Sequence, residues 1–120
     1  GDSRAYRFGP TGVFRLTEDH SWVAERLKEG VLTRTEAERH PYRNVLTRAL
    51  GLPEARFDLV EVRLAPGEGV LLVTDGLYGH VPEEEWRLGR DLQASLEAIV
   101  AEALRRGGDD NVTAVALRVE

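Results

Sequence analysis

Hydrophobic and polar residues alternate in two parts of the chain, and both parts predict β-hairpins. In the first, residues 4–8 and 13–16 flank a Gly-Pro-Thr-Gly turn, so that two short strands can pair antiparallel. In the second, residues 57–64 carry apolar side chains at intervals and lead through a Pro-Gly-Glu-Gly turn into the apolar run 70–74. The second hairpin is more apolar than the first, and we expect it to be more deeply buried.

Two short helices are predicted between these hairpins. Residues 21–29 carry valine and leucine four positions apart and stop before Gly30, which is typical of a helix closed by a glycine cap. Thr33 and Thr35 are each followed three residues later by glutamate, the pattern of a capping box at a helix start. This second helix is predicted to end near His40, because a proline follows it.

The longest predicted helix covers residues 91–106, with Asp91 as its N-cap and two arginines before a Gly-Gly stop. Its apolar stripe comprises Leu92, Leu96, Ile99, Val100, Ala103 and Leu104. Residues 111–119 then form the last predicted strand. Strand pairs separated by helices predict an α+β fold with largely antiparallel pairing, in one domain covering residues 1–120.

The amino-acid composition limits the partners, metal ligands and cellular location that we expect for this protein. The 120 residues include 21 acidic and 16 basic side chains, a net charge of −5, which argues against a nucleic-acid partner. There is no cysteine, so oxygen or imidazole groups must bind any metal. Because the chain has no membrane segment and no signal-peptide pattern, we expect a cytoplasmic protein. It contains no methionine and starts at Gly1, which indicates a fragment or processed product of a longer protein.

Three aspartates lie where predicted elements end. Asp75 follows the apolar run and precedes Gly76, Asp110 lies between the last predicted helix and strand, and Asp2 lies in the opening Gly-Asp-Ser-Arg. Carboxylates held at the ends of rigid elements are suitable ligands for a hard divalent cation. Taken one at a time, these residues could equally be turn, cap or chain-end residues.

Five short motifs follow one another along the chain: Gly1-Asp2-Ser3-Arg4, Leu16-Thr17-Glu18-Asp19-His20-Ser21, His40-Pro41-Tyr42-Arg43-Asn44-Val45-Leu46-Thr47-Arg48-Ala49-Leu50-Gly51, Thr74-Asp75-Gly76-Leu77 and Asp110-Asn111-Val112-Thr113. Together they resemble the C-terminal part of the bacterial PP2C-type (PPM) metal-dependent serine/threonine phosphatases. The resemblance covers nearly the whole chain. It implies a PP2C-like αββα four-layer sandwich, to which this chain supplies the C-terminal antiparallel strands and helices.

The resemblance also implies roles for the three aspartates. Asp75 is similar to the core metal ligand at the end of a central strand, and Asp110 to its companion on the same metal. Asp2 resembles the ligand of an additional, weaker third metal. The implied cofactor is Mn²⁺ or Mg²⁺, with two and possibly three ions in the complete domain. Residues from about 22 to 43 resemble the flap beside the active site, which in this family influences substrate choice.

The implied reaction is hydrolysis of phosphoserine and phosphothreonine in proteins by a metal-activated water. The family's N-terminal half supplies an Asp-Gly-x-Gly-Gly segment that is absent here. We therefore expect the parent protein to be the phosphatase and the isolated chain to be inactive. The implied partners are a phosphoprotein substrate and an opposing Ser/Thr kinase system in bacterial signalling. A missing half would also expose sheet edges and apolar faces, which favours self-association.

Two other functions stay open on the sequence. The chain could be a non-catalytic regulatory or interaction module derived from the phosphatase fold, or a structural domain stabilised by a metal. The histidines His20, His40 and His80 lie in separate segments, and we assign them no catalytic role. We interpret residues 83–85 as the acidic first turn of a helix. Arg43 is expected to anchor the flap, and the alternative is that it binds phosphate.

Overall fold

The computed structural model describes residues 1–53, 55–107 and 111–120, which fall into two compact units. One consists of Gly1–Asp2 and Glu18–Val60, and we call it the helical unit. The other consists of Ser3–Thr17 and Glu61–Glu120, and we call it the sheet unit. The sequence predicted one domain with a flap at about 22–43, and that segment lies inside the helical unit.

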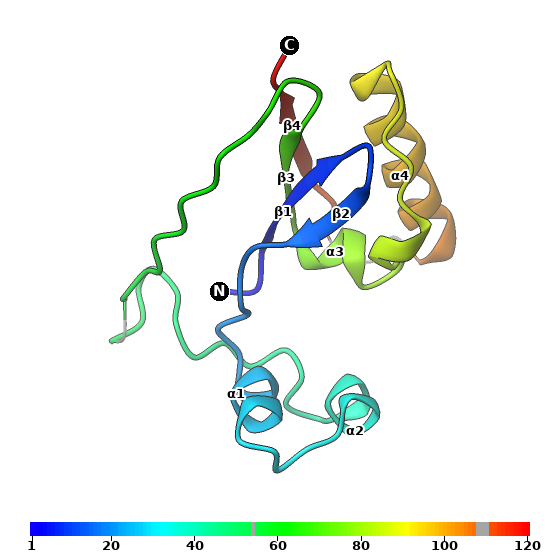
Figure 1. Ribbon diagram of the computed structural model, residues 1–120. Helices are drawn as coiled ribbons and strands as arrows, with labels where there is room; N and C mark the ends of the chain where they lie inside the picture. Colours follow the sequence, from blue (N-terminus) through cyan, green and yellow to red (C-terminus); the bar gives the residue numbers. More distant parts are fainter. Residues whose placement is uncertain (54, 108–110) are drawn as a thin grey trace. The chain divides into compact units, whose positions relative to one another are not determined.

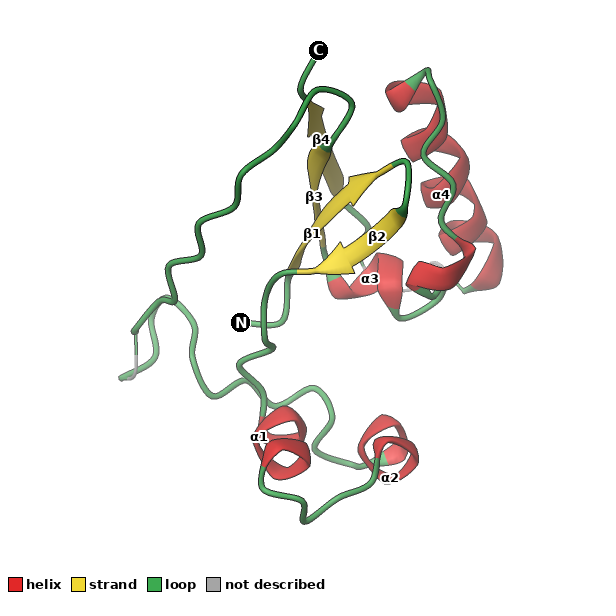
Figure 2. Cartoon of the chain, in the orientation of Figure 1, coloured by secondary structure: helices red, strands yellow, loops and turns green. Residues whose placement is uncertain are grey.

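The sheet unit contains four antiparallel strands in the order β2-β1-β3-β4 (Figures 1 and 2). The strands are β1 (Arg4–Gly9), β2 (Gly12–Arg15), β3 (Gly69–Val73) and β4 (Ala114–Arg118). β1 and β2 form the predicted first hairpin. β3 is central, because Leu71 faces Tyr6 of β1 on one side and Ala116 of β4 on the other. The apolar run before Asp75 is therefore a central strand, as the resemblance implied.

The predicted strand at residues 57–64 is wrong. These residues lead into β3 as a loop (Figure 2) and pair with no strand of the described chain. Phe57 and Leu59 are 84% and 82% exposed. The expected hairpin with β3 cannot form because both edges of β3 are already hydrogen-bonded, to β1 and to β4. A strand-like pattern without an available edge leaves the segment unpaired.

One face of the sheet carries the core, covered by α4 (Leu92–Arg106) (Figure 1). The Asp91 carboxylate caps α4 by accepting a hydrogen bond from the Ala94 amide at 3.0 Å, as predicted. The core cluster comprises Tyr6, Phe8, Leu71, Val73, Leu77, Val81, Trp86, Leu96, Ile99 and Ala103. Leu104 was predicted in the apolar stripe but is 53% exposed, because it lies about 100° around the helix from buried Ala103.

Two short elements connect β3 to α4. α3 (Asp75–Tyr78) begins directly after the central strand, and a 3₁₀ turn, η1 (Glu83–Glu85), follows Pro82. The helix predicted to begin at Pro82 is therefore a single turn. Trp86 closes this connection in the core: its ring packs edge-on against Tyr6 at 4.9 Å, and its indole Nε1 donates to the Val81 carbonyl at 2.9 Å.

The opposite face of the sheet is apolar and exposed. Leu72 of β3 lies directly across from Val115 of β4, and Val70 lies across from Leu117. The large apolar side chains exposed on this face are Phe14, Leu72, Val115 and Leu117. Such a face is normally covered by a second layer in a folded domain, so it is available for packing against another element.

The helical unit has the two predicted helices, α1 (Trp22–Lys28) and α2 (Arg34–Arg39). Ser21 caps α1 by accepting from the Ala24 amide at 3.2 Å, and Gly30 follows the helix with a φ of 77°. Thr33 and Glu36 form the capping box of α2, in which each side chain accepts from the other's backbone amide. The local start and stop signals therefore act as predicted.

Candidate functional site

The carboxyl end of β3 presents the first predicted metal ligand. Asp75 is the first residue of α3 and is half-buried. Thr74 precedes it, but its hydroxyl does not cap α3. The hydroxyl instead accepts a hydrogen bond from the Thr113 amide at 3.0 Å and donates to the Asn111 carbonyl at 3.3 Å. The Thr74 amide also donates to the Thr113 carbonyl at 3.1 Å.

Gly76 lets two chain segments approach closely at this corner. A Cβ built on Gly76 would lie 2.2 Å from the Asn111 carbonyl oxygen and 2.9 Å from its carbonyl carbon. Only glycine permits this contact without movement. The residue after Asp75 and the residue after Asp110 are thus held against each other, although the two positions are far apart in the sequence.

The structure describes two of the three predicted metal ligands, Asp75 and Asp2. Asp75 lies at the corner just described, whereas Asp110 lies outside the described residues. Asp2 belongs to the helical unit and is half-buried, next to the Gly1 carbonyl that accepts from the His20 amide at 2.8 Å. Within residues 1–53, 55–107 and 111–120, no group of three or more histidine, cysteine, aspartate or glutamate side chains could hold a metal ion.

The donor chemistry at the end of β3 fits a hard divalent cation. Asp75 offers carboxylate oxygens from a rigid strand end, and the chain has no thiolate that would favour a softer metal. Gly76, which follows Asp75, packs closely on Asn111, which follows Asp110. The chemistry of the Asp75 carboxylate is therefore that of a ligand for Mg²⁺ or Mn²⁺.

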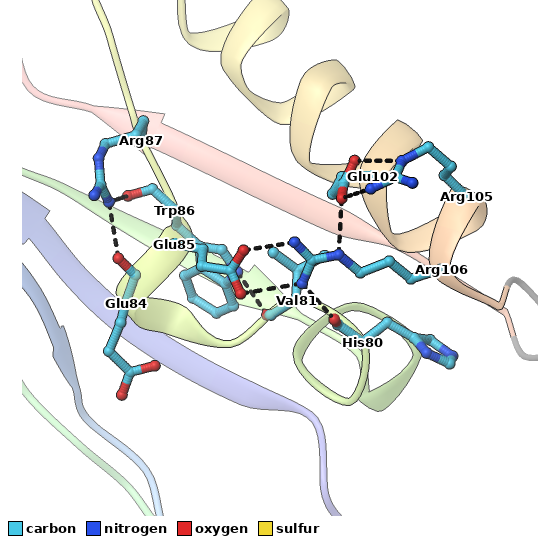
Figure 3. Close-up of polar contacts among 9 residues, drawn as sticks. All are labelled: His80, Val81, Glu84, Glu85, Trp86, Arg87, Glu102, Arg105 and Arg106. Carbon is cyan, nitrogen blue, oxygen red and sulfur yellow. Dashed lines mark hydrogen bonds and ion pairs between the residues drawn. The ribbon is translucent and has the colours of Figure 1, made fainter.

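An ion-pair network that the sequence analysis missed joins the end of α4 to the segment after α3 (Figure 3). The Arg106 guanidinium bonds both carboxylate oxygens of Glu85, with 3.0 Å between Nη1 and Oε2. Its Nε donates to Glu102 at 2.8 Å, and Nη1 also donates to the His80 carbonyl at 3.0 Å. Arg105 bonds Glu102 as well. The Arg-Arg pair was interpreted only as a helix-end signal, because its acceptor Glu85 is 21 residues away.

These contacts shift the pKa values of the charged groups in the network. Hydrogen bonds from Arg105 and then Arg106 lower the pKa of Glu102 to about 2. The hydrogen bond from Arg106 lowers the pKa of Glu85, and the two carboxylates raise the pKa of Arg106. All three groups are therefore charged at neutral pH.

The helical unit has its own polar and aromatic contacts. His20 Nε2 lies 2.7 Å from Asp58 Oδ2, and Arg48 donates to Asp58 Oδ1 at 3.0 Å; together they lower the pKa of Asp58. Arg43 donates to the His40 carbonyl at 3.1 Å, three residues earlier in the same segment, and its expected anchoring role stays a prediction. The imidazole of His40 packs against Trp22 with 4.7 Å between ring centroids.

The chain is similar in sequence to known proteins. Residues 21–120 match the family model described as Stage II sporulation protein E (SpoIIE). The chain is similar to the serine/threonine phosphatase stp of Listeria welshimeri, with 36% identity over 118 residues that cover 94% of this chain and 47% of that protein.

Solved structures give the same result. The PPM Ser-Thr phosphatase MsPP of Mycobacterium smegmatis, in complex with cacodylate, has a TM-score of 0.83 and 35% identity, covering 100% of this chain and 53% of that one. The catalytic domain of the serine/threonine protein phosphatase PstP, in complex with two manganese ions, has a TM-score of 0.76 and 28% identity, covering 100% of this chain and 51% of that one. The chain thus spans about half the length of the relatives that it matches.

One structural finding bears on membrane association. None of the helices in the described part of the chain combines the length and apolar character needed to cross a bilayer.

Proposed function

The chain belongs to the PP2C-type (PPM) family of serine/threonine phosphatases, and from this membership we propose that its parent protein hydrolyses phosphoserine and phosphothreonine in proteins. One observation of the structure carries the proposal. The Thr74 hydroxyl and the Gly76 backbone join the Asp75 corner to the segment that begins at Asn111, directly after Asp110. A cation-dependent phosphatase needs carboxylate ligands held close together, and this contact brings the residues that follow Asp75 and Asp110 together.

In this proposal, Asp75 and Asp110 hold a divalent cation and Asp2 holds a weaker additional one. When bound, such cations supply an activated water and neutralise charge on the phosphoryl group. The chain itself contributes rigid support. The central position of β3 fixes the start of α3, and the two hydrogen bonds of the Thr74 hydroxyl limit movement of the opposite segment. The PstP complex with two manganese ions supports Mn²⁺, and Mg²⁺ has the same preference for oxygen ligands.

We also propose that the 120 residues alone do not hydrolyse phosphoproteins. They span about half the length of their relatives and contain no Asp-Gly-x-Gly-Gly segment. The exposed apolar face of the sheet supports this division, because the other half of the parent protein would cover it. In the isolated chain the same face favours self-association.

The remaining parts of the proposal concern recognition and setting. We assign residues from about 22 to 43 as the flap, in which the rings of Trp22, His40 and Tyr42 pack together. The substrate class is a phosphoprotein, with a Ser/Thr kinase as the opposing enzyme, in bacterial cytoplasmic signalling. The likeness to the stp phosphatase supports this class of substrate.

The test compares the parent protein with its Asp75→Asn variant in Mn²⁺-dependent hydrolysis of a phosphothreonine peptide, alongside calorimetric titration with Mn²⁺. Asp91→Asn is the matched control, because it makes the same change at a helix cap where asparagine also serves. We expect hydrolysis to be lost only in Asp75→Asn. Hydrolysis by Asp75→Asn at the parental rate would refute the proposal. If the unmodified parent binds Mn²⁺ tightly but does not hydrolyse the peptide, the metal is structural. If the parent neither binds Mn²⁺ nor hydrolyses the peptide, the result favours an interaction module.

A further inference from the structure

We propose that Arg106 is a positioning residue that joins the end of α4 to the segment following β3 and thereby sets the approach of the two metal-binding corners. This inference rests on the proposed function.

The contacts of Arg106 connect two elements. Within α4, its Nε donates to Glu102 one turn earlier at 2.8 Å, which orients the side chain. Beyond α4, the guanidinium binds Glu85 through both carboxylate oxygens and donates to the His80 carbonyl at 3.0 Å (Figure 3). One side chain thus bonds both ends of the segment from His80 to Glu85.

A second contact supports the same connection. A Cβ built on Gly107 would lie 2.6 Å from His80 Cε1 and 3.1 Å from its Nδ1, so the imidazole packs directly on the glycine that ends α4. His80 therefore meets the α4 terminus through its carbonyl, by way of Arg106, and through its ring.

Both sides of Asp110 are consequently attached to one short stretch of chain. On the upstream side, Arg106 and Gly107 are held by the segment from His80 to Glu85. On the downstream side, residues 111–113 are held by Thr74 and Gly76. The stretch from residue 74 to residue 85 also contains Asp75, so it holds residues 106–107 and 111–113 while it carries one of the predicted ligands.

The three acceptors around residue 106 are suited to an arginine side chain. A guanidinium presents several donors in a fixed plane, which allows it to serve Glu85, Glu102 and a backbone carbonyl together. An isolated surface ion pair contributes little to stability. The importance of Arg106 therefore lies in geometry. Groups that hydrogen-bond metal ligands directly change metal affinity about 10- to 100-fold when removed, so a residue that acts through the chain should have an effect near the lower end of that range.

The experiment measures Mn²⁺ affinity of the parent protein by calorimetry in Arg106→Gln, Glu85→Gln and the double variant. Arg105→Gln is the matched control: Arg105 is the adjacent arginine, it bonds the same Glu102, and its side chain is 72% exposed. Arg106→Lys keeps the charge without the planar fork. Hydrogen exchange of the peptide covering residues 107–113, measured in metal-free protein, provides a readout independent of metal and activity.

We expect Arg106→Gln and Glu85→Gln each to weaken Mn²⁺ binding about tenfold, with the double variant no weaker than the worse single variant. Arg106→Lys should lie between Arg106→Gln and the parent, and exchange in residues 107–113 should be faster in Arg106→Gln than in Arg105→Gln. Equal Mn²⁺ affinity in Arg106→Gln and Arg105→Gln would overturn the positioning role and leave the proposed function intact. Failure of the unmodified parent to bind Mn²⁺ would overturn both. If Arg106→Gln does not fold, Glu85→Gln and Arg106→Lys decide the question.

Discussion

The contact between Gly76 and Asn111 leads to a sharp prediction for Gly76→Ala in the parent protein. The added methyl would lie 2.2 Å from the Asn111 carbonyl oxygen, whereas carbon and oxygen atoms in contact are normally about 3.3 Å apart. The two segments must therefore separate by about 1.1 Å. Both sides of the contact are backbone, so no side-chain rotation can relieve it.

The expected effects on catalysis and on stability are similar in free energy, because a 100-fold loss of rate corresponds to about 2.7 kcal/mol. Overpacking of this kind costs about 1–3 kcal/mol of the free energy of unfolding. A displacement of about 1 Å between catalytic groups reduces the rate about 100-fold. We therefore expect Gly76→Ala to remain folded while its kcat/KM for a phosphothreonine peptide, at saturating Mn²⁺, falls about 100-fold.

Gly89→Ala is the matched control, since it adds the same methyl to the sheet unit and meets only Ser95 Oγ, at an ordinary 3.6 Å. Circular dichroism would establish that both variants are folded at the assay temperature. A kcat/KM within about threefold of the parent in Gly76→Ala would refute the reasoning, because a displacement of about 1 Å would then be without consequence for the reaction.

Two further predictions concern stability. Leu71→Ala should lower the free energy of unfolding by about 2–5 kcal/mol in urea denaturation, because Leu71 is fully buried in the central strand, whereas Leu104→Ala on the exposed side of α4 should have little effect; equal effects would contradict the assigned core. Folding lowers the pKa of Glu102 from 4.5 to about 2. The ionised Glu102 therefore stabilises the folded state above pH 4.5, and this stabilisation is lost as the pH falls towards 2. Glu102→Gln should therefore flatten the decline of the urea midpoint between these pH values, and an unchanged decline would show that Glu102 does not cause it.

Local features of the fold could be predicted from the sequence because they depend on neighbouring residues. The capping box of Thr33 and Glu36, the Ser21 cap and the first hairpin were confirmed. The family was also recognised correctly from five motifs in order. The assignment of Asp75, Asp110 and Asp2 as metal ligands stays a prediction.

The error at residues 57–64 has a different origin. Apolar residues at intervals describe a segment that can form a strand, but a strand also needs a free edge with which to pair. β3 offered no such edge, because β1 pairs with one of its edges and β4, more than 40 residues further along the chain than β3, pairs with the other. Strand pairing is a property of the whole sheet, and a local pattern contains no information about it.

By itself, therefore, the sequence determined the helix ends, the first hairpin, the family and the aspartates that deserve testing as ligands. Only the tertiary structure decided that Gly76 packs on Asn111, that the Thr74 hydroxyl bridges to Thr113, and that Arg106 binds Glu85. Each of these contacts joins residues 21 or more positions apart. Such contacts form only after the sheet and α4 have brought distant segments together, and no local periodicity or capping signal specifies them.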